Sequence, residues 1–253
     1  MTTDSHEPQL PKLRWSFSQW ESYDSCPAKW KFKNVLKLPS LPPGPAAARG
    51  LDLHDRVEKA ILGEISFTDL TTADPNVRFG GKPQAVVAPK YLEVIQAFRD
   101  HPNGDRYAEK KLAFDAEFYC CSPQSSFAAC IAVLDAAKYT RPRYTDKGVL
   151  DIGEWKSGSP KDSHKQQREL YALFGLRTWL ANEVRVTTYY LEHDDVPPQR
   201  LVVSDTATEK LKAIWIQRSE QMANDQLCAP RPGMQCNWCD YAKKKGGPCQ
   251  FGN

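Results

Sequence analysis

The chain has 253 residues, of which 41% are hydrophobic and 26% are charged, and its formal net charge is +3. This length is enough for one large domain or for one domain with a small appendage, and the composition is ordinary for a soluble globular protein. The low net charge excludes binding of nucleic acid by the chain as a whole, so any such site must be a local patch.

The beginning of the chain predicts no folded element. Residues 1–13 are polar and contain two prolines, a pattern typical of neither a signal peptide nor a transit helix. No apolar run reaches the roughly 18 residues that a membrane helix needs, so we expect no membrane partner. We therefore expect a flexible N-terminal arm over residues 1–13, a single domain over residues 14–253, and a cytoplasmic protein of a bacterial, archaeal or phage-infected cell.

Helix signals dominate the beginning of the domain. Ser18 is placed to cap a short helix that Pro27 ends, and residues 39–48 form a stiff proline-rich connector. Residues 50–62 carry an apolar stripe and predict a second helix.

A loop and a third helix are expected next. Residues 63–88 are rich in turn-forming residues and predict a loop, and residues 89–100 predict a helix with proline in its first turn.

Strand signals follow in the middle of the chain. Residues 111–119 alternate between apolar and polar side chains, residues 127–136 form a nearly continuous apolar run, and residues 148–156 give a third strand.

The remainder of the chain mixes helix and strand signals. Residues 163–182 have helical periodicity, and residues 183–191 are rich in β-branched and aromatic side chains. Thr206 and Glu209 have the spacing of a capping box and predict a helix to about Asn224. This order predicts an α/β (α+β) fold with one central mixed sheet flanked by helices.

The third predicted strand carries an acidic and a basic side chain on one face. Glu154 and Lys156 are two residues apart, so both point to the same side, and Asp135 ends the preceding apolar strand. If the two strands pair, the two carboxylates can share Mg²⁺ or Mn²⁺, and the lysine can orient water and stabilise negative charge during phosphodiester hydrolysis. A solvent-exposed ion pair explains the same residues without catalysis. Asp151 is the alternative acid, but its odd spacing from Glu154 directs it to the other face.

The cysteines suggest a metal site. The chain has eight of them and no signal peptide, which favours metal ligands over disulfides. Cys236-x-x-Cys239 followed by Cys249 has the spacing of a metal site and needs a fourth ligand. Cys228 can complete a local four-cysteine zinc site.

Taken in order, several motifs resemble the PD-(D/E)XK nuclease superfamily, in particular its branch with the RecB and AddB nuclease domains and the CRISPR-associated Cas4 proteins. The stretches that carry the resemblance are Ser16-Phe-Ser18 with Tyr23 and Cys26-Pro27, Gly50-x-x-x-His54, Asp135, Glu154-x-Lys156-Ser157-Gly158 and Gln167-x-x-x-Tyr171. Together they span about residues 16–249. Two positions depart from the family's pattern, because Ala132 and Ala136 stand where the family usually has glycine and often arginine.

The resemblance implies a restriction-endonuclease-like core and a role for each matched residue. His54, Asp135 and Glu154 would bind the catalytic cation with the backbone carbonyl of Trp155, and Lys156 would be the catalytic lysine. Gln167 and Tyr171, one helical turn apart, would contact DNA or brace the site.

The same resemblance implies that the fourth cysteine comes from the far end of the chain. A [4Fe–4S] cluster would then join residues 14–38 and 225–253 in one subdomain. Its ligands would be Cys26, Cys236, Cys239 and Cys249.

Basic residues near both chain ends predict a phosphate-binding rim beside this cluster, with aromatic neighbours that can stack on unpaired bases. A solvated lysine face explains them equally well. The predicted contacts are Lys29, Lys31, Lys33, Lys243, Lys244 and Lys245, with a second rim near the metal at Arg141 and Arg143.

These features together predict a metal-dependent DNA exonuclease that acts on single-stranded DNA or DNA ends. Recombination, repair, phage DNA processing and CRISPR adaptation all suit such an enzyme. The chain has no P-loop, so unwinding would need a helicase or a recombination or CRISPR-adaptation partner. The alternatives are a non-catalytic iron–sulfur DNA-binding subunit and a structural zinc adaptor.

Overall fold

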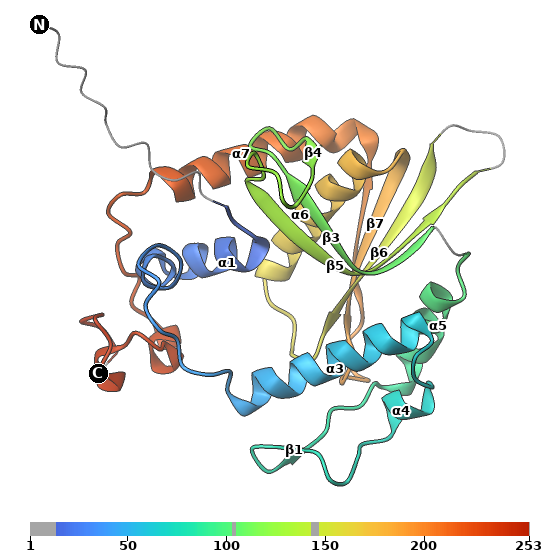
Figure 1. The fold of residues 1–253 in the computed structure, drawn as a ribbon, viewed down its shortest axis with the longest axis horizontal. Helices are drawn as coiled ribbons and strands as arrows, with labels where there is room; N and C mark the ends of the chain where they lie inside the picture. The colour runs from blue at the N-terminus through green and yellow to red at the C-terminus, as the bar shows by residue number, and fades with distance from the viewer. Residues whose placement is uncertain (1–13, 103–104, 143–146, 253) are drawn as a thin grey trace, which may run out of the picture.

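The centre of the molecule is a mixed sheet. The computed structural model describes residues 14–102, 105–142 and 147–252, and the largest sheet within these ranges has six strands in the order β4-β3-β5-β6-β7-β8 (Figure 1). β6 and β7 run parallel, whereas the other neighbours are antiparallel. The predicted α/β fold with a central mixed sheet flanked by helices is confirmed.

The strands of this sheet have the following bounds. They are β3 (Arg106–Phe114), β4 (Cys120–Cys121), β5 (Cys130–Thr140), β6 (Gly148–Lys156), β7 (Ala181–Tyr190) and β8 (Gln199–Ser204). A separate small hairpin has the strands β1 (Arg78–Phe79) and β2 (Lys82–Pro83).

The helices and helical turns lie mostly before and after the strands. They are α1 (Phe17–Ser25), α2 (Pro27–Trp30), η1 (Lys31–Val35), α3 (Pro45–Leu62), α4 (Thr68–Thr71), η2 (Pro89–Tyr91), α5 (Leu92–Arg99), α6 (Ser163–Thr178), η3 (Asp205–Ala207), α7 (Thr208–Asn224), η4 (Met234–Trp238) and η5 (Lys243–Lys245).

Helices cover both faces of the sheet, so two hydrophobic clusters form. α3 and α5 lie on one face, with Leu53 and Phe98 packed near Trp155 of β6. α1, α6 and α7 lie on the other face, where Leu150 and Phe174 belong to the larger cluster (Figure 1). β5 and β6 are the two central strands of the sheet, so they lie between these two helical layers. The candidate site lies on these strands.

Several predicted boundaries are wrong because local turns move them. β3 ends at Phe114 rather than residue 119, because Oδ1 of Asp115 accepts the backbone N–H groups of Glu117 (2.9 Å) and Tyr119 (2.8 Å) and closes a turn. β5 begins at Cys130 rather than residue 127, after a turn in which Ser125 Oγ accepts the N–H of Phe127 at 3.1 Å.

Two predicted helix signals are also wrong. Thr206 does not cap α7: it lies in η3, its Oγ1 is 2.6 Å from Ser204 Oγ, and α7 begins two residues later. Ser18 lies inside α1, which begins at Phe17. α1 does end just before Pro27, at Ser25, as predicted, and Pro27 then starts α2. Proline is favoured in the first helical turn because the missing N–H has no partner there in any case.

The predicted loop over residues 63–88 contains α4 and the hairpin β1–β2, and the edge strand β8 was missed. Among the residues that the structure describes, no helix is both long and apolar enough to span a membrane.

The two chain ends pack against each other. The hydroxyl of Tyr241 lies 2.9 Å from Ser40 Oγ and donates to the carbonyl of Leu38 at 3.2 Å, and its ring centroid is 5.5 Å from that of Phe32. Figure 1 shows the C-terminal segment (red) beside the segment after α1 (blue).

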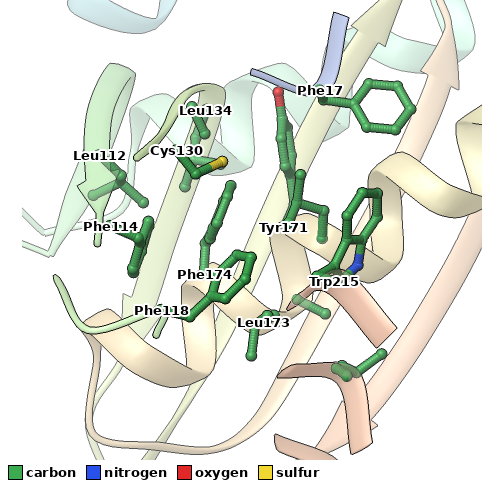
Figure 2. Packing of buried hydrophobic residues seen from close by; sticks show 14 of the residues in the cluster. Phe17, Leu112, Phe114, Phe118, Cys130, Leu134, Tyr171, Leu173, Phe174 and Trp215 are labelled. Atoms are coloured by element: carbon green, nitrogen blue, oxygen red, sulfur yellow. The ribbon is translucent and has the colours of Figure 1, made fainter. Parts of the chain in front are cut away.

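The larger hydrophobic cluster contains aromatic rings that stack on one another, among aliphatic side chains (Figure 2). Phe174 is fully buried, and its ring lies 4.3 Å from that of Phe114 with an interplanar angle of 6°. We expect Phe174→Ala to lower the free energy of unfolding by about 3–5 kcal/mol. Urea denaturation tests this against Leu51→Ala on α3, which is 64% exposed and should change stability by less than about 0.5 kcal/mol.

Candidate functional site

Two acidic side chains lie where β5 and β6 separate. The last pair of the β5–β6 ladder at this end is Ala136–Gly153, so Asp135 and Glu154 are the next residues on the two strands, just beyond the end of the ladder, and the charge of Asp135 acts on Glu154. Oδ2 of Asp135 accepts the backbone N–H of Trp155 at 2.7 Å. The Asp135 carboxylate thus accepts a backbone N–H of β6 at the point where the β5–β6 ladder ends.

Glu154 is held from two sides through one oxygen. Lys156 Nζ (2.6 Å) and Gln167 Nε2 (2.7 Å) both donate to Oε1. The residue is 4% exposed, and its Oε2 has no hydrogen-bond partner in the described part of the chain. A buried carboxylate oxygen without a donor is costly unless a cation or proton occupies it.

The protonation of Glu154 reflects this environment. Burial, and then the negative charge of Asp135, raise the pKa of Glu154 to about 7, against the opposing effect of Lys156. A cation between the two carboxylates would offset both the cost of burying the charge of Glu154 and its repulsion by Asp135. Proton uptake and cation binding therefore compete for this oxygen.

His54 reaches the same place from α3. A Cβ at Gly50 would lie 2.6 Å from Ser157 Oγ, so the glycine lets α3 approach the end of β6 closely. One turn later, Nδ1 of His54 lies 3.6 Å from Oδ2 of Asp135. Burial lowers the pKa of His54, but the hydrogen bond and charge of Asp135 outweigh it and raise the pKa.

Gln167 and Tyr171 form a buried brace on α6. Gln167 Nε2 donates to the Tyr171 hydroxyl (3.1 Å), which in turn donates to the carbonyl of Val133 on β5 (3.1 Å). Both residues are 6% exposed. Of the two roles that the resemblance implies, these contacts favour bracing of Glu154.

The described residues do not form a complete ligand set for a metal ion. Within the described residues, no group of three or more His, Cys, Asp or Glu side chains lies close enough to hold a metal ion. Asp135 and Glu154 bond to protein donors instead. The predicted ligands His54, Asp135, Glu154 and the Trp155 carbonyl therefore stay a prediction, to which the unpartnered Oε2 of Glu154 is suited.

Four cysteines line one pocket between the chain ends. The pocket is narrow and is lined by residues from 26–32 and 230–251, among them Lys29 and Phe32. Its cysteines are Cys26, Cys236, Cys239 and Cys249. Cys228 does not line it, because its Sγ donates to the carbonyl of Asp225 at 2.9 Å.

The predicted basic residues do not all lie together. Lys243, Lys244 and Lys245 are exposed in η5, within the last cysteine loop, and Lys29 lines the cysteine pocket. Lys31 and Lys33 lie nearby in η1.

Arg141 lies elsewhere. It follows the far end of β5, where Nε and Nη2 donate to Asp105 at 3.0–3.1 Å. At about 3.3 Å per residue it is roughly 20 Å along the strand from Asp135, so the prediction of a rim near the metal is wrong for Arg141. Arg143 lies outside the described residues.

The sequence did not point to Glu109, another acid near the site. It lies on β3 between Ala108 and Lys110, which pair with Ala136 and Leu134, and so stands opposite Asp135 with φ of 46°. Partial burial and the charge of Asp135 raise the pKa of Glu109 to about 7. Only the register of β3 against β5 could have predicted this neighbour.

Comparison with known proteins agrees with the fold and with the motifs. A sequence profile described as the PD-(D/E)XK nuclease superfamily matches residues 14–243. No protein with a curated description matches.

Two solved structures are similar in shape. SSO0001 has 13% identity and a TM-score of 0.42, with 94% of this chain and 87% of that chain covered. A candidate exonuclease from Eubacterium rectale has 11% identity and a TM-score of 0.43, with 96% and 92% covered. Scores at this level carry no argument about activity, but the profile covers most of the chain. The chain belongs to the PD-(D/E)XK nuclease superfamily.

Proposed function

We propose that the protein is a Mg²⁺- or Mn²⁺-dependent deoxyribonuclease that degrades single-stranded DNA or DNA ends as an exonuclease. The observation that carries the proposal is the position of Asp135 and Glu154 on adjacent strands, with a buried Oε2 that lacks a donor and with Lys156 alongside. Structural ion pairs alone do not require an unpartnered buried oxygen.

In this proposal the catalytic cation is held by His54, Asp135, Glu154 and the Trp155 carbonyl. When bound, it would polarise the phosphodiester and lower the pKa of a water molecule. In the hydrolysis itself, a water oxygen forms a bond to phosphorus, one P–O bond of the backbone breaks, and the leaving oxygen takes up the proton that the water gives up.

Lys156 is the positively charged side chain that would face the phosphate of the substrate in this proposal. Its Nζ is fixed 2.6 Å from Glu154 Oε1 and its side chain is 25% exposed, so the ammonium is oriented and still reachable by substrate. Burial lowers its pKa, but the charge and hydrogen bond of Glu154 outweigh burial and raise it. The lysine stays protonated and can stabilise the negative charge that develops on the phosphate.

We further propose membership of the branch with the RecB, AddB and Cas4 proteins, with a [4Fe–4S] cluster on Cys26, Cys236, Cys239 and Cys249. The shared pocket of these four cysteines supports the proposal, and thiolates are the usual ligands of such clusters. The lysines of η5 and η1, with Lys29, would contact DNA phosphates beside it. Pathways that present open DNA ends, with or without a helicase partner, suit this enzyme.

A nuclease assay tests the proposal directly. End-labelled single- and double-stranded DNA is incubated with Mn²⁺ and either the wild type or Lys156→Ala. We expect cleavage by the wild type and about 10²–10³-fold slower turnover by the variant, the usual cost of removing one donor to a developing anion.

Lys165→Ala is the matched control, because Lys165 is an exposed lysine on α6 outside the site. Equal activity of the wild type and Lys156→Ala, or no wild-type cleavage with either metal, would favour the non-catalytic DNA-binding subunit instead.

A further inference from the structure

A cavity opens beside Lys156 and adjoins the candidate site. It lies between the start of α1 and the first turn of α6 and is open to solvent. Phe17, Ile131 and Val133 form an apolar wall. The polar lining includes Lys156, Gln167 and Tyr171 of the candidate site, together with Ser16, Ser18, Glu21, Lys161 and His164.

His164 is a buried polar residue of this cavity, and it does not belong to the brace of Gln167 and Tyr171. The residue is 6% exposed, and its Nδ1 accepts the backbone N–H of Lys161 (3.4 Å) and lies 3.0 Å from the Tyr190 hydroxyl. An acceptor Nδ1 leaves the proton of a neutral ring on Nε2. Within the described part of the chain, Nε2 has no hydrogen-bond partner, so it is a donor that protein groups leave unused.

Lys161 is the lysine of this cavity for which no acidic partner lies within the described residues, because Lys156 is already paired with Glu154 at 2.6 Å. Lys156 and Lys161 line the cavity against one acid, Glu21, whose Oε1 already accepts the Ser163 hydroxyl at 2.6 Å. The cavity also faces the N-terminal turn of α6, a helix of 16 residues whose dipole favours anions at this end.

The imidazole stays neutral here. Burial, followed by the charges of Lys156 and Lys161, lowers the pKa of His164 to about 4. A neutral donor that does not titrate near pH 7 is suited to bind an anion that is already charged.

We propose that this cavity binds a second phosphate group of the DNA strand, next to the phosphate that is cleaved. Lys161 supplies the charge, His164 Nε2 supplies a fixed hydrogen bond, and the apolar wall faces the attached sugar. The inference rests on the proposed nuclease function, since it places the strand across Lys156. The phosphate is either a terminal monoester or an internal diester.

Binding to DNA without divalent metal tests this independently of cleavage. Fluorescein-labelled single-stranded oligonucleotides are titrated in EDTA with the wild type, Lys161→Ala, His164→Leu, His164→Gln and the control Lys165→Ala. We expect Kd to rise about 10-fold for Lys161→Ala and His164→Leu, as for loss of a hydrogen bond to a charged group. His164→Gln retains a donor and should bind close to the wild type. Lys161→Ala should also reduce the salt dependence of log Kd by about 0.7.

Four oligonucleotide forms separate the two sources of phosphate: 5′-phosphorylated, 3′-phosphorylated, unphosphorylated and circular. A loss confined to one phosphorylated form identifies a terminal monoester, and an equal loss on all forms identifies an internal diester. Either result supports the inference.

The inference is overturned if Lys161→Ala matches Lys165→Ala in both Kd and salt dependence on every form. Lys161 is exposed, so misfolding does not obscure this result. If the variants lose affinity while the wild type never cleaves DNA, the nuclease proposal fails and the phosphate site stands.

Discussion

Glu154→Gln is expected to slow DNA hydrolysis by about 10⁴-fold, because a cation held by this carboxylate contributes several kcal/mol to the transition state. The same change is expected to stabilise the metal-free fold. The Glu154 side chain is 5% exposed, and its charge lies beside that of Asp135 without a partner for Oε2. The neutral amide removes that repulsion and can still accept from Gln167.

The sign of the pH dependence follows from the raised pKa. A carboxyl that titrates at about 7 in the fold and near 4.3 when unfolded binds more protons in the folded state between these values. Its contribution to stability is present below the unfolded pKa and is lost as pH rises through about 7. The raised pKa of His54 acts in the same direction.

Thermal denaturation in EDTA checks both statements. The Tm of the wild type should fall between pH 5 and pH 8, and that of Glu154→Gln should fall less. At pH 8 the variant should be more stable by on the order of 1–3 kcal/mol.

Asp151→Asn is the matched control for these measurements. Asp151 lies on the same strand, three residues before Glu154, with Arg200 at 3.6 Å. It should retain both the activity and the pH slope of the wild type. A Glu154→Gln protein that still cleaves DNA at the wild-type rate contradicts the catalytic assignment.

If the proposed cluster is present, Cys236→Ser is expected to abolish it and to lower the free energy of unfolding by roughly 2–5 kcal/mol, the range for removal of a native cross-link. The cross-link would tie Cys26 to the other chain end, so its loss frees a very long loop in the unfolded chain. A Tm lower by roughly 10 °C follows for a domain of this size. Visible absorbance and the iron and sulfide content of anaerobically purified protein report the cluster.

Two further cysteine variants decide between the competing sites. Cys26→Ser should behave as Cys236→Ser does, and Cys228→Ser should keep its iron, since Cys228 lies outside the pocket of the other four. Bound zinc that survives Cys26→Ser and is lost with Cys228→Ser contradicts the cluster and supports a local zinc site. Cys120→Ser, an exposed residue on β4, controls for the substitution itself.

The sequence was sufficient for the fold class and for the bounds of β6, whereas the roles of Asp135 and Glu154 stay a prediction. The bounds of β6 were predicted correctly because Gly148 and Ser157 flank an apolar run, and the spacing of Glu154 and Lys156 then fixed their common side. The parallel placement of β7 beside β6 follows from the helix that connects them.

The features that the sequence could not predict depend on contacts between segments that are distant along the chain. Glu109 has no motif and comes near Asp135 only through the β3–β5 register. His164 is an ordinary helical histidine in sequence, and only the approach of Ser16 and Ser18 makes a cavity around it. Arg141 failed as a candidate because the length of β5 beyond Asp135 was underestimated.

One helix connects the two centres of this molecule. α1 is followed directly by Cys26, and on the same helix Trp20 donates to Gln166 Oε1 (2.8 Å) while Glu21 accepts from Ser163 (2.6 Å). Both partners belong to α6, whose next residue, Gln167, holds Glu154. A short series of hydrogen bonds thus links the start of the cysteine pocket to the acidic pair, so we expect a displacement of α1 at Cys26 to disturb the bond between Gln167 and Glu154.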